Sequence, residues 1–269
     1  MNMIRILVCL LFGCYFPLPG KGQVGNLLKL PSAEIVNVKG EAPFSFMTNP
    51  ALLAFQKGWH WGLGAEKRIS MPGWVSMLSV ISIENRYGKW GLGVAQEGIA
   101  GFSKQQGALT HARELSDEIS MGVTLGFLRN KAAGYAASID PIASVGMVLD
   151  LTKSLQLGLT VSNDYSVVST HSLTGLKLGA GFCFRPSSLV NIRLQCLKES
   201  GYKAGLLVAC SYRPSSIVKI SMGVLLEPQW GWMAMDFSLR TFSIRLQAAW
   251  NPLMGMNSGL LLYGPDKAE

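Results

Sequence analysis

Charged residues are scarce in this sequence, at 15% of 269 residues, against roughly 25% in an average soluble domain. Hydrophobic residues make up 49%, so much of the surface must face something other than water. Beyond the N-terminus, no run approaches the ~18 apolar residues that a membrane-spanning helix needs. A spanning chain without such runs must close into a barrel, because only a closed sheet satisfies every backbone polar group in lipid.

The sequence also lacks a disulfide framework and a basic stripe. Three cysteines remain after the N-terminal region, an odd number on three different candidate strands: Cys183, Cys196 and Cys210. The formal net charge is +8, but the basic residues are scattered singly along the chain. Nucleic acids bind clustered Lys and Arg, so we expect no nucleic-acid partner. Lys and Arg on strand faces fit a hydrated lumen or the anionic lipid at a barrel rim.

Catalytic signals are equally poor. The three histidines have no neighbouring Cys, Asp or Glu at metal-ligand spacing: His60, His111 and His171. Glycine pairs such as Gly62 with Gly64 and Gly91 with Gly93 lack the strand-to-helix context of a phosphate loop, and in a barrel strand they accommodate close packing. The sequence therefore predicts a protein that is not an enzyme, with no cofactor and no metal.

The N-terminus has the pattern of an export signal. Arg5 supplies a short positive region, residues 6–16 are apolar, and Gly20-Lys21-Gly22 places small residues before a cleavage point at Gln23. We expect a signal peptide over residues 1–22. A lipobox-like sequence ending at Cys14 offers an alternative, in which Cys14 is acylated, and both interpretations export the chain.

From about residue 58 onward the chain divides into short segments in which apolar residues alternate with polar or small ones. The clearest segment sets Phe242, Ile244, Leu246, Ala248 and Trp250 against Ser243, Arg245, Gln247 and Ala249. Segments of about ten residues with this period are typical of tilted membrane-spanning strands, whereas strands of soluble sandwiches average nearer six. We predict an all-β fold: an antiparallel transmembrane β-barrel of about 14 strands over residues 58–269, in the outer membrane and in contact with its lipid and lipopolysaccharide. Residues 23–57 lack the alternation and are predicted to form a plug-like segment with a short helix.

The same alternation separates the side chains that face the lumen from those that face lipid. Six polar residues are predicted to face inward: Lys177, Arg193, Gln195, Lys219, Arg245 and Gln247. Their general role is to hydrate and pack the lumen. A sharper role is contact with the plug or with a permeating solute.

A nine-residue segment occurs twice, at 184–192 (FRPSSLVNI) and 212–220 (YRPSSIVKI). Arg-Pro-Ser-Ser is turn chemistry, because Pro fixes φ at the corner and Ser caps freed backbone groups. Both corners are expected on the periplasmic side, where barrels keep their short connections. Regions 98–107, 130–141 and 164–172 are irregular, and are either longer loops or poorly patterned strands. Most tryptophans lie near segment ends and are predicted to form an aromatic girdle: Trp59, Trp61, Trp74, Trp90, Trp230, Trp232 and Trp250.

The most specific local motif is Asn49-Pro50-Ala51, followed by Leu-Leu-Ala. Asn is a favoured N-cap and Pro suits the first helical position, so the motif predicts a short capped helix. Placed just before the first strand of an exported barrel, it resembles the PorV/PorQ-type outer-membrane proteins of Bacteroidota and, more distantly, FadL-type barrels. Segments 108–122, 154–163 and 250–255 are also similar to short motifs of that family.

The resemblance implies a component or accessory of type IX protein secretion, with secretion-machinery or cargo proteins as partners. The alternative is a FadL-like transporter, in which a plugged lumen takes up hydrophobic small molecules. A purely structural barrel is a third possibility.

Overall fold

The computed structural model describes residues 43–69, 71–163, 175–200, 203–227, 229–252 and 255–264. Across this part of the chain fourteen strands follow one another: β1 His60–Arg68, β2 Val75–Asn85, β3 Gly88–Ile99, β4 Phe102–Glu114, β5 Ile119–Ala132, β6 Ser138–Thr152, β7 Leu155–Asn163, β8 Leu176–Phe184, β9 Val190–Glu199, β10 Gly205–Tyr212, β11 Val218–Leu225, β12 Trp230–Ser238, β13 Ser243–Asn251 and β14 Gly255–Gly264. The predicted signal peptide, residues 1–22, and the alternative at Cys14 lie outside the described residues.

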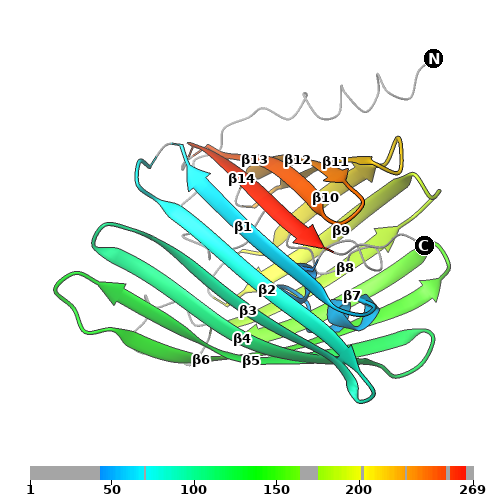
Figure 1. The fold of residues 1–269 in the computed structure, drawn as a ribbon, viewed down its shortest axis with the longest axis horizontal. Helices are drawn as coiled ribbons and strands as arrows, with labels where there is room; N and C mark the ends of the chain where they lie inside the picture. Colours follow the sequence, from blue (N-terminus) through cyan, green and yellow to red (C-terminus); the bar gives the residue numbers. More distant parts are fainter. Residues whose placement is uncertain are drawn as a thin grey trace.

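Each strand pairs antiparallel with its neighbours in sequence, and β1 pairs with β14, which closes the sheet into a barrel. Gly62 of β1 lies opposite Tyr263 of β14, so the first and last strands join in register. Figure 1 shows the closed wall and its lopsided form, in which β4, β5 and β6 extend furthest. The predicted fold class and the predicted strand number are both confirmed.

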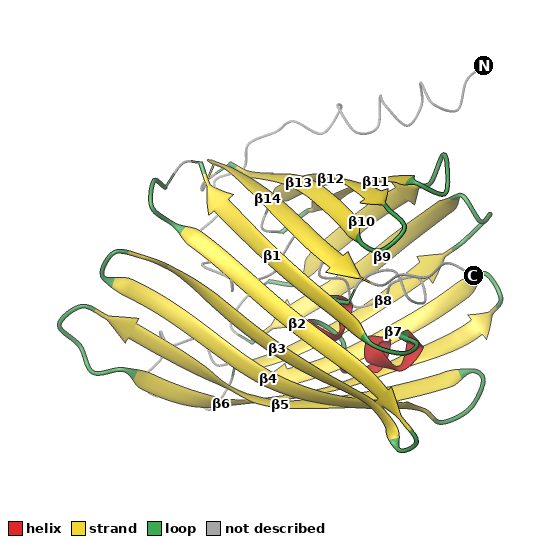
Figure 2. Cartoon of the chain, in the orientation of Figure 1, coloured by secondary structure: helices red, strands yellow, loops and turns green. Residues whose placement is uncertain are grey.

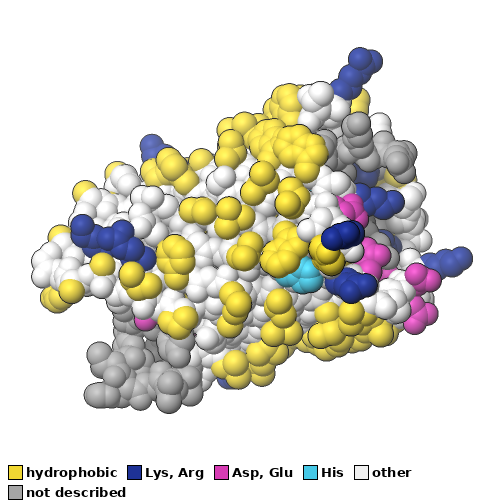
Figure 3. Space-filling model, turned by 60° about the horizontal axis from the view of Figure 1, so that its bottom comes forward, with side chains coloured by type: hydrophobic (Ala, Val, Ile, Leu, Met, Phe, Trp, Pro, Cys, Tyr) yellow, Lys and Arg dark blue, Asp and Glu magenta, His cyan; other side chains and the backbone are white. Residues whose placement is uncertain are grey.

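The alternation in the sequence becomes the two faces of the wall. In β3, Gly91, Gly93 and Ala95 are buried inside, whereas Leu92 and Val94 are 49% and 53% exposed outside. Hydrophobic side chains spread over the outer surface in the view of Figure 3. An exposed apolar wall around a closed sheet is the arrangement that lipid requires. No helix in the described ranges is long and apolar enough to cross a membrane.

Two sequence expectations are resolved by the strands. The irregular regions 98–107 and 130–141 are mostly strand, because β3 and β4 are joined at residues 100–101 and β5 and β6 at residues 133–137. Region 164–172 lies outside the described residues. The girdle prediction is wrong for Trp232, which is 1% exposed and packs inside the barrel against Ala209, Ala234 and Ala249.

Six turns lie at one end of the barrel, and we call this end the plug rim: residues 86–87, 115–118, 153–154, 185–189, 213–217 and 239–242. The barrel begins at His60 and ends at Gly264, and both residues are at this end. The longest connection, residues 164–175, joins β7 to β8 at the opposite end. The sequence analysis expects the two Arg-Pro-Ser-Ser corners on the periplasmic side, and this orientation of the plug rim stays a prediction.

Candidate functional site

A short helical segment occupies the barrel interior. It consists of two 3-10 helices, η1 Ser45–Met47 and η2 Pro50–Phe55, and we call residues 43–57 the plug. Figure 2 shows these helices enclosed by the strands near the plug rim. Five of the six residues of η2 are buried. The segment therefore blocks part of the lumen instead of lying outside the wall.

Asn49 begins η2 and also joins it to the wall. Its backbone is extended (φ −131°, ψ 109°), its side-chain oxygen accepts a hydrogen bond from the amide of Ala51 at 3.1 Å, and Pro50 follows as the first helical residue. This is the N-cap chemistry that the sequence motif predicts. The side-chain nitrogen donates to the carbonyls of Met147 and Leu159, at 3.5 and 3.4 Å. Asn49 is 0% exposed, so one amide side chain both caps the helix and ties it to β6 and β7.

The wall makes room for the plug by omitting side chains. Five inward-facing glycines on β1, β3, β5 and β6 contact it: Gly62, Gly91, Gly93, Gly122 and Gly146. A Cβ at Gly122 would lie 2.5 Å from the carbonyl carbon of Pro50, and one at Gly91 would lie 2.9 Å from the ring of Phe46. A Cβ at Gly93 would collide with Met47, and one at Gly146 would collide with Asn49. We call these five glycines the glycine seat.

Apolar side chains fill the contact between plug and wall. Phe44, Phe46 and Leu53 are buried, and they pack with residues of β2–β4 and β14. The ring of Phe44 meets the ring of Tyr263 edge to face, with centroids 6.1 Å apart. Fully burying a side chain of this size contributes about 1.5–3 kcal/mol. The plug is therefore held mainly by hydrophobic packing.

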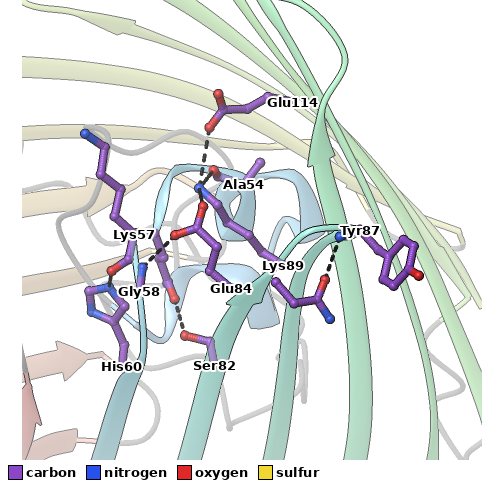
Figure 4. A network of polar contacts seen from close by, with 11 residues as sticks. Ala54, Lys57, Gly58, His60, Ser82, Glu84, Tyr87, Lys89 and Glu114 are labelled. Carbon is purple, nitrogen blue, oxygen red and sulfur yellow. Dashed lines mark hydrogen bonds and ion pairs between the residues drawn. The ribbon is translucent and has the colours of Figure 1, made fainter.

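Polar contacts hold the end of the plug at the plug rim, as Figure 4 shows. The ammonium of Lys89 donates to the carbonyl of Ala54 and lies 3.8 Å from Glu84 and 3.5 Å from Glu114. The same Glu84 accepts a hydrogen bond from the amide of Gly58 at 2.7 Å. A cation near the last carbonyls of a helix satisfies acceptors that have no partner within the helix.

Two further contacts fix the chain as it leaves the plug. The hydroxyl of Ser82 donates to the side-chain oxygen of Gln56 at 2.6 Å, and the ring of His60 lies 2.8 Å from the carbonyl of Lys57. His60 is thus a structural residue at the start of β1. Among the residues that the structure describes, no group of three or more His, Cys, Asp and Glu could hold a metal ion.

The six residues that the sequence predicts to face the lumen lie on the buried faces of β8, β9, β11 and β13. Their exposures are 7% for Lys177, 2% for Arg193, 1% for Gln195, 7% for Lys219, 5% for Arg245 and 6% for Gln247. They follow the wall from β8 to β13, whereas the glycine seat lies on β1–β6. The plug therefore contacts mainly residues other than the six polar ones that the sequence predicts to face the lumen.

The most developed contact among these polar residues has a partner that the sequence analysis missed. Arg245 donates two hydrogen bonds to Asp236, at 2.5 and 3.1 Å, and Tyr263 donates a third at 3.0 Å. A two-pronged Arg–carboxylate pair satisfies both buried charges. Because Tyr263 also touches Phe44, this cluster supports the plug from the side. Asp236 lies on the same face of β12 as Trp232, four residues along the strand. The alternation of that strand could have identified Asp236 as an inward-facing residue.

No protein-family description and no curated protein matches the sequence. Solved structures do match the fold. The toluene transporter TbuX of Ralstonia pickettii is 10% identical with a TM-score of 0.60, and the match covers 83% of this chain and 92% of that one. The toluene transporter TodX of Pseudomonas putida is 9% identical with a TM-score of 0.60, covering 82% and 91%. A FadL homologue of Pseudomonas aeruginosa is 10% identical with a TM-score of 0.57, covering 82% and 92%.

These likenesses concern the fold. They support the more distant resemblance to FadL-type barrels and give no specific support to the resemblance to PorV/PorQ-type proteins. With its apolar outer wall, the chain is an outer-membrane β-barrel of 14 strands that has the fold of the FadL-type barrels.

Proposed function

We propose that the chain is a plugged, non-enzymatic channel that takes small hydrophobic molecules across the outer membrane. The observation that carries this proposal is the plug seated on inward-facing glycines inside a barrel whose fold is that of hydrocarbon channels. A plug allows a channel to admit a particular solute while it keeps the pore closed to other molecules.

The inner wall offers a second supporting feature. Trp232 packs with Ala209, Ala234 and Ala249, forming an apolar cluster on β10, β12 and β13 that does not include the plug residues. A Cβ at Gly223 would lie 2.7 Å from the indole nitrogen of Trp232, so the ring lies against the wall. These four side chains are only 1–4% exposed, so a hydrophobic solute would reach this apolar cluster only if the neighbouring side chains move apart.

The test is a deletion strain. Uptake of a labelled long-chain fatty acid and a labelled monoaromatic hydrocarbon is measured in intact cells with the gene present, deleted and restored. The proposal expects uptake to fall several-fold on deletion and to return on restoration. Unchanged uptake of both solutes on deletion would exclude it.

Type IX secretion remains a second candidate, favoured by the resemblance of Asn49-Pro50-Ala51 to the PorV/PorQ motif. It predicts that the deletion strain fails to release secreted proteins while hydrocarbon uptake stays normal. Affinity purification from outer membranes would recover secretion-machinery or cargo proteins. A strain that secretes normally without the barrel would exclude this candidate.

A further inference from the structure

The outward face of β5 changes character towards the end of the barrel opposite the plug rim. Leu125 and Phe127 are 67% and 50% exposed on the lipid-facing side, and the next two side chains on that face are Arg129 and Lys131. A charged side chain on the lipid face is costly at the middle of the bilayer and tolerated near its surface. Arg129 therefore marks the edge of the apolar band on this strand.

Two neighbouring strands change at the same level. Gln96 of β3 lies opposite Gln105 of β4, which lies opposite Arg129 of β5. The side-chain nitrogen of Gln105 donates to Gln96 at 3.5 Å, and its oxygen accepts a hydrogen bond from the guanidinium of Arg129 at 3.0 Å. We call Gln96, Gln105, Arg129 and Lys131 the outer ladder. Its hydrogen bonds hold the guanidinium on the outer face, at the edge of the apolar band.

Neither cation of the outer ladder has an acidic partner in the ranges that the structure describes. Arg129 donates to the neutral amide of Gln105, and neither Arg129 nor Lys131 takes part in an ion pair. The connections next to them, residues 100–101 and 133–137, contain no Asp or Glu. In Figure 3 a group of Lys and Arg side chains lies near the left-hand tip of the molecule, which β5 and β6 form in Figure 1.

The acids at this end of the β1–β6 wall belong to its inner face. Glu66 and Glu97 are 7% and 2% exposed, and Glu97 lies 3.8 Å from the ammonium of Lys104. Asp140 of β6 lies opposite Leu128, which is 1% exposed inside the barrel, so the side chain of Asp140 is on the inner face as well. The sheet thus separates these carboxylates from the two cations on its outer face.

We propose that the outer ladder binds a phosphate group of lipopolysaccharide, the anionic glycolipid of the outer leaflet. The predicted orientation, with the plug rim towards the periplasm, places the outer ladder in that leaflet. Arg129 and Lys131 are roughly 7 Å apart along the strand, so both can reach one phosphate. The guanidinium matches phosphate oxygens with two parallel hydrogen bonds, and the ammonium adds a point charge. Ile139, opposite Arg129 and 67% exposed, continues the apolar contact with the acyl chains.

The test uses the full chain purified in detergent and two forms of the lipid anchor of lipopolysaccharide. One form carries both phosphates, the other carries none, and their acyl chains are the same. Native mass spectrometry gives the ratio of the two forms that stay bound. The ladder variant is Arg129→Gln/Lys131→Gln. The matched control removes two exposed cations from the plug rim, Lys153→Gln/Arg240→Gln. Heat-modified mobility on a gel shows that each variant is folded.

The wild type should retain the phosphorylated form in clear excess. The ladder variant should lose about tenfold or more of that preference, since each cation near an anionic surface contributes roughly fivefold, and the control should keep it. A wild type without any preference would overturn the proposal.

A ladder variant with wild-type preference would also overturn it and leave the outer ladder to another occupant, such as an acidic protein. Equal losses in both variants would reduce the effect to net charge and refute the proposal as well. If the ladder variant does not fold, Lys131→Gln alone takes its place, because no hydrogen bond or ion pair in the described part of the chain involves that side chain. The expected loss of preference is then roughly fivefold, and no loss would overturn the proposal.

Discussion

Filling the glycine seat with methyl groups should unseat the plug only when several are added together. The plug buries four large apolar side chains, Phe44, Phe46, Leu52 and Leu53, each at most 7% exposed. At about 1.5–3 kcal/mol each, they hold the plug by about 6–12 kcal/mol. One extra methyl in a packed interior costs about 1–3 kcal/mol. A single Gly122→Ala forces the backbone of Pro50 and Ala51 to move, but its cost stays below the attachment of the plug.

The variant Gly91→Ala/Gly93→Ala/Gly122→Ala/Gly146→Ala adds four such costs, about 4–12 kcal/mol in total, which is comparable with the attachment of the plug. Conductance of the purified chain in planar bilayers measures the outcome. Gly122→Ala should stay as closed as the wild type, and the fourfold variant should show frequent open steps.

The control for this experiment adds a methyl group that meets only the wall. In Gly259→Ala the new atom would contact the end of the Gln247 side chain, at 2.8 Å, and this side chain belongs to the wall. This variant should conduct like the wild type. Full opening by Gly122→Ala alone, or a fourfold variant that is folded and as closed as the wild type, would refute the reasoning.

Three further variants test other contacts of the plug. Asn49→Ala removes the N-cap and two hydrogen bonds to the wall, so the stability of η2 should fall by about 0.5–2 kcal/mol. In this variant a cysteine introduced at Ser45 should react faster with a thiol reagent than in a chain that keeps Asn49. An unchanged rate would contradict the role of Asn49 in holding the plug. Lys89→Met leaves the carbonyl of Ala54 without its partner, and protease should then cleave the chain near Gly58 faster than in the exposed control Lys67→Met; equal cleavage in the two would count against the contact. Asp236→Leu removes the carboxylate that pairs with the buried charge of Arg245, so the free energy of unfolding, measured with urea in detergent, should fall by about 3–5 kcal/mol. The double variant Asp236→Leu/Arg245→Met should recover part of that loss. A single variant as stable as the wild type would be inconsistent with the buried pair.

The barrel was predictable because its main determinant is local. A strand in lipid needs one apolar face over its whole length, and in segments such as 242–250 the alternation of apolar and polar residues already shows that face. The closing pair of β1 with β14 then follows from the need to satisfy the edge strands. The capped helix at Asn49 was predictable for the same reason, since cap and first turn are neighbours in sequence.

Contacts between distant segments were less accessible. The paired glycines of β1 and β3 signalled close packing, but only the fold shows that Phe44, Phe46 and Met47 fill the space. The interior position of Trp232 was missed because β12 is apolar on both faces, with Met233 and Met235 outside. Only Asp236 marks its inner face.

The most direct measurement of the proposed function is hydrocarbon uptake by intact cells of a host that has neither its own hydrocarbon channel nor type IX secretion. An intact outer membrane is essential, because phospholipid bilayers alone do not hold back small apolar molecules. Cells that express the wild-type chain should take up a labelled monoaromatic hydrocarbon several-fold faster than cells without it, with no change for a sugar of similar size. Equal hydrocarbon uptake with and without the barrel in the outer membrane would contradict the account.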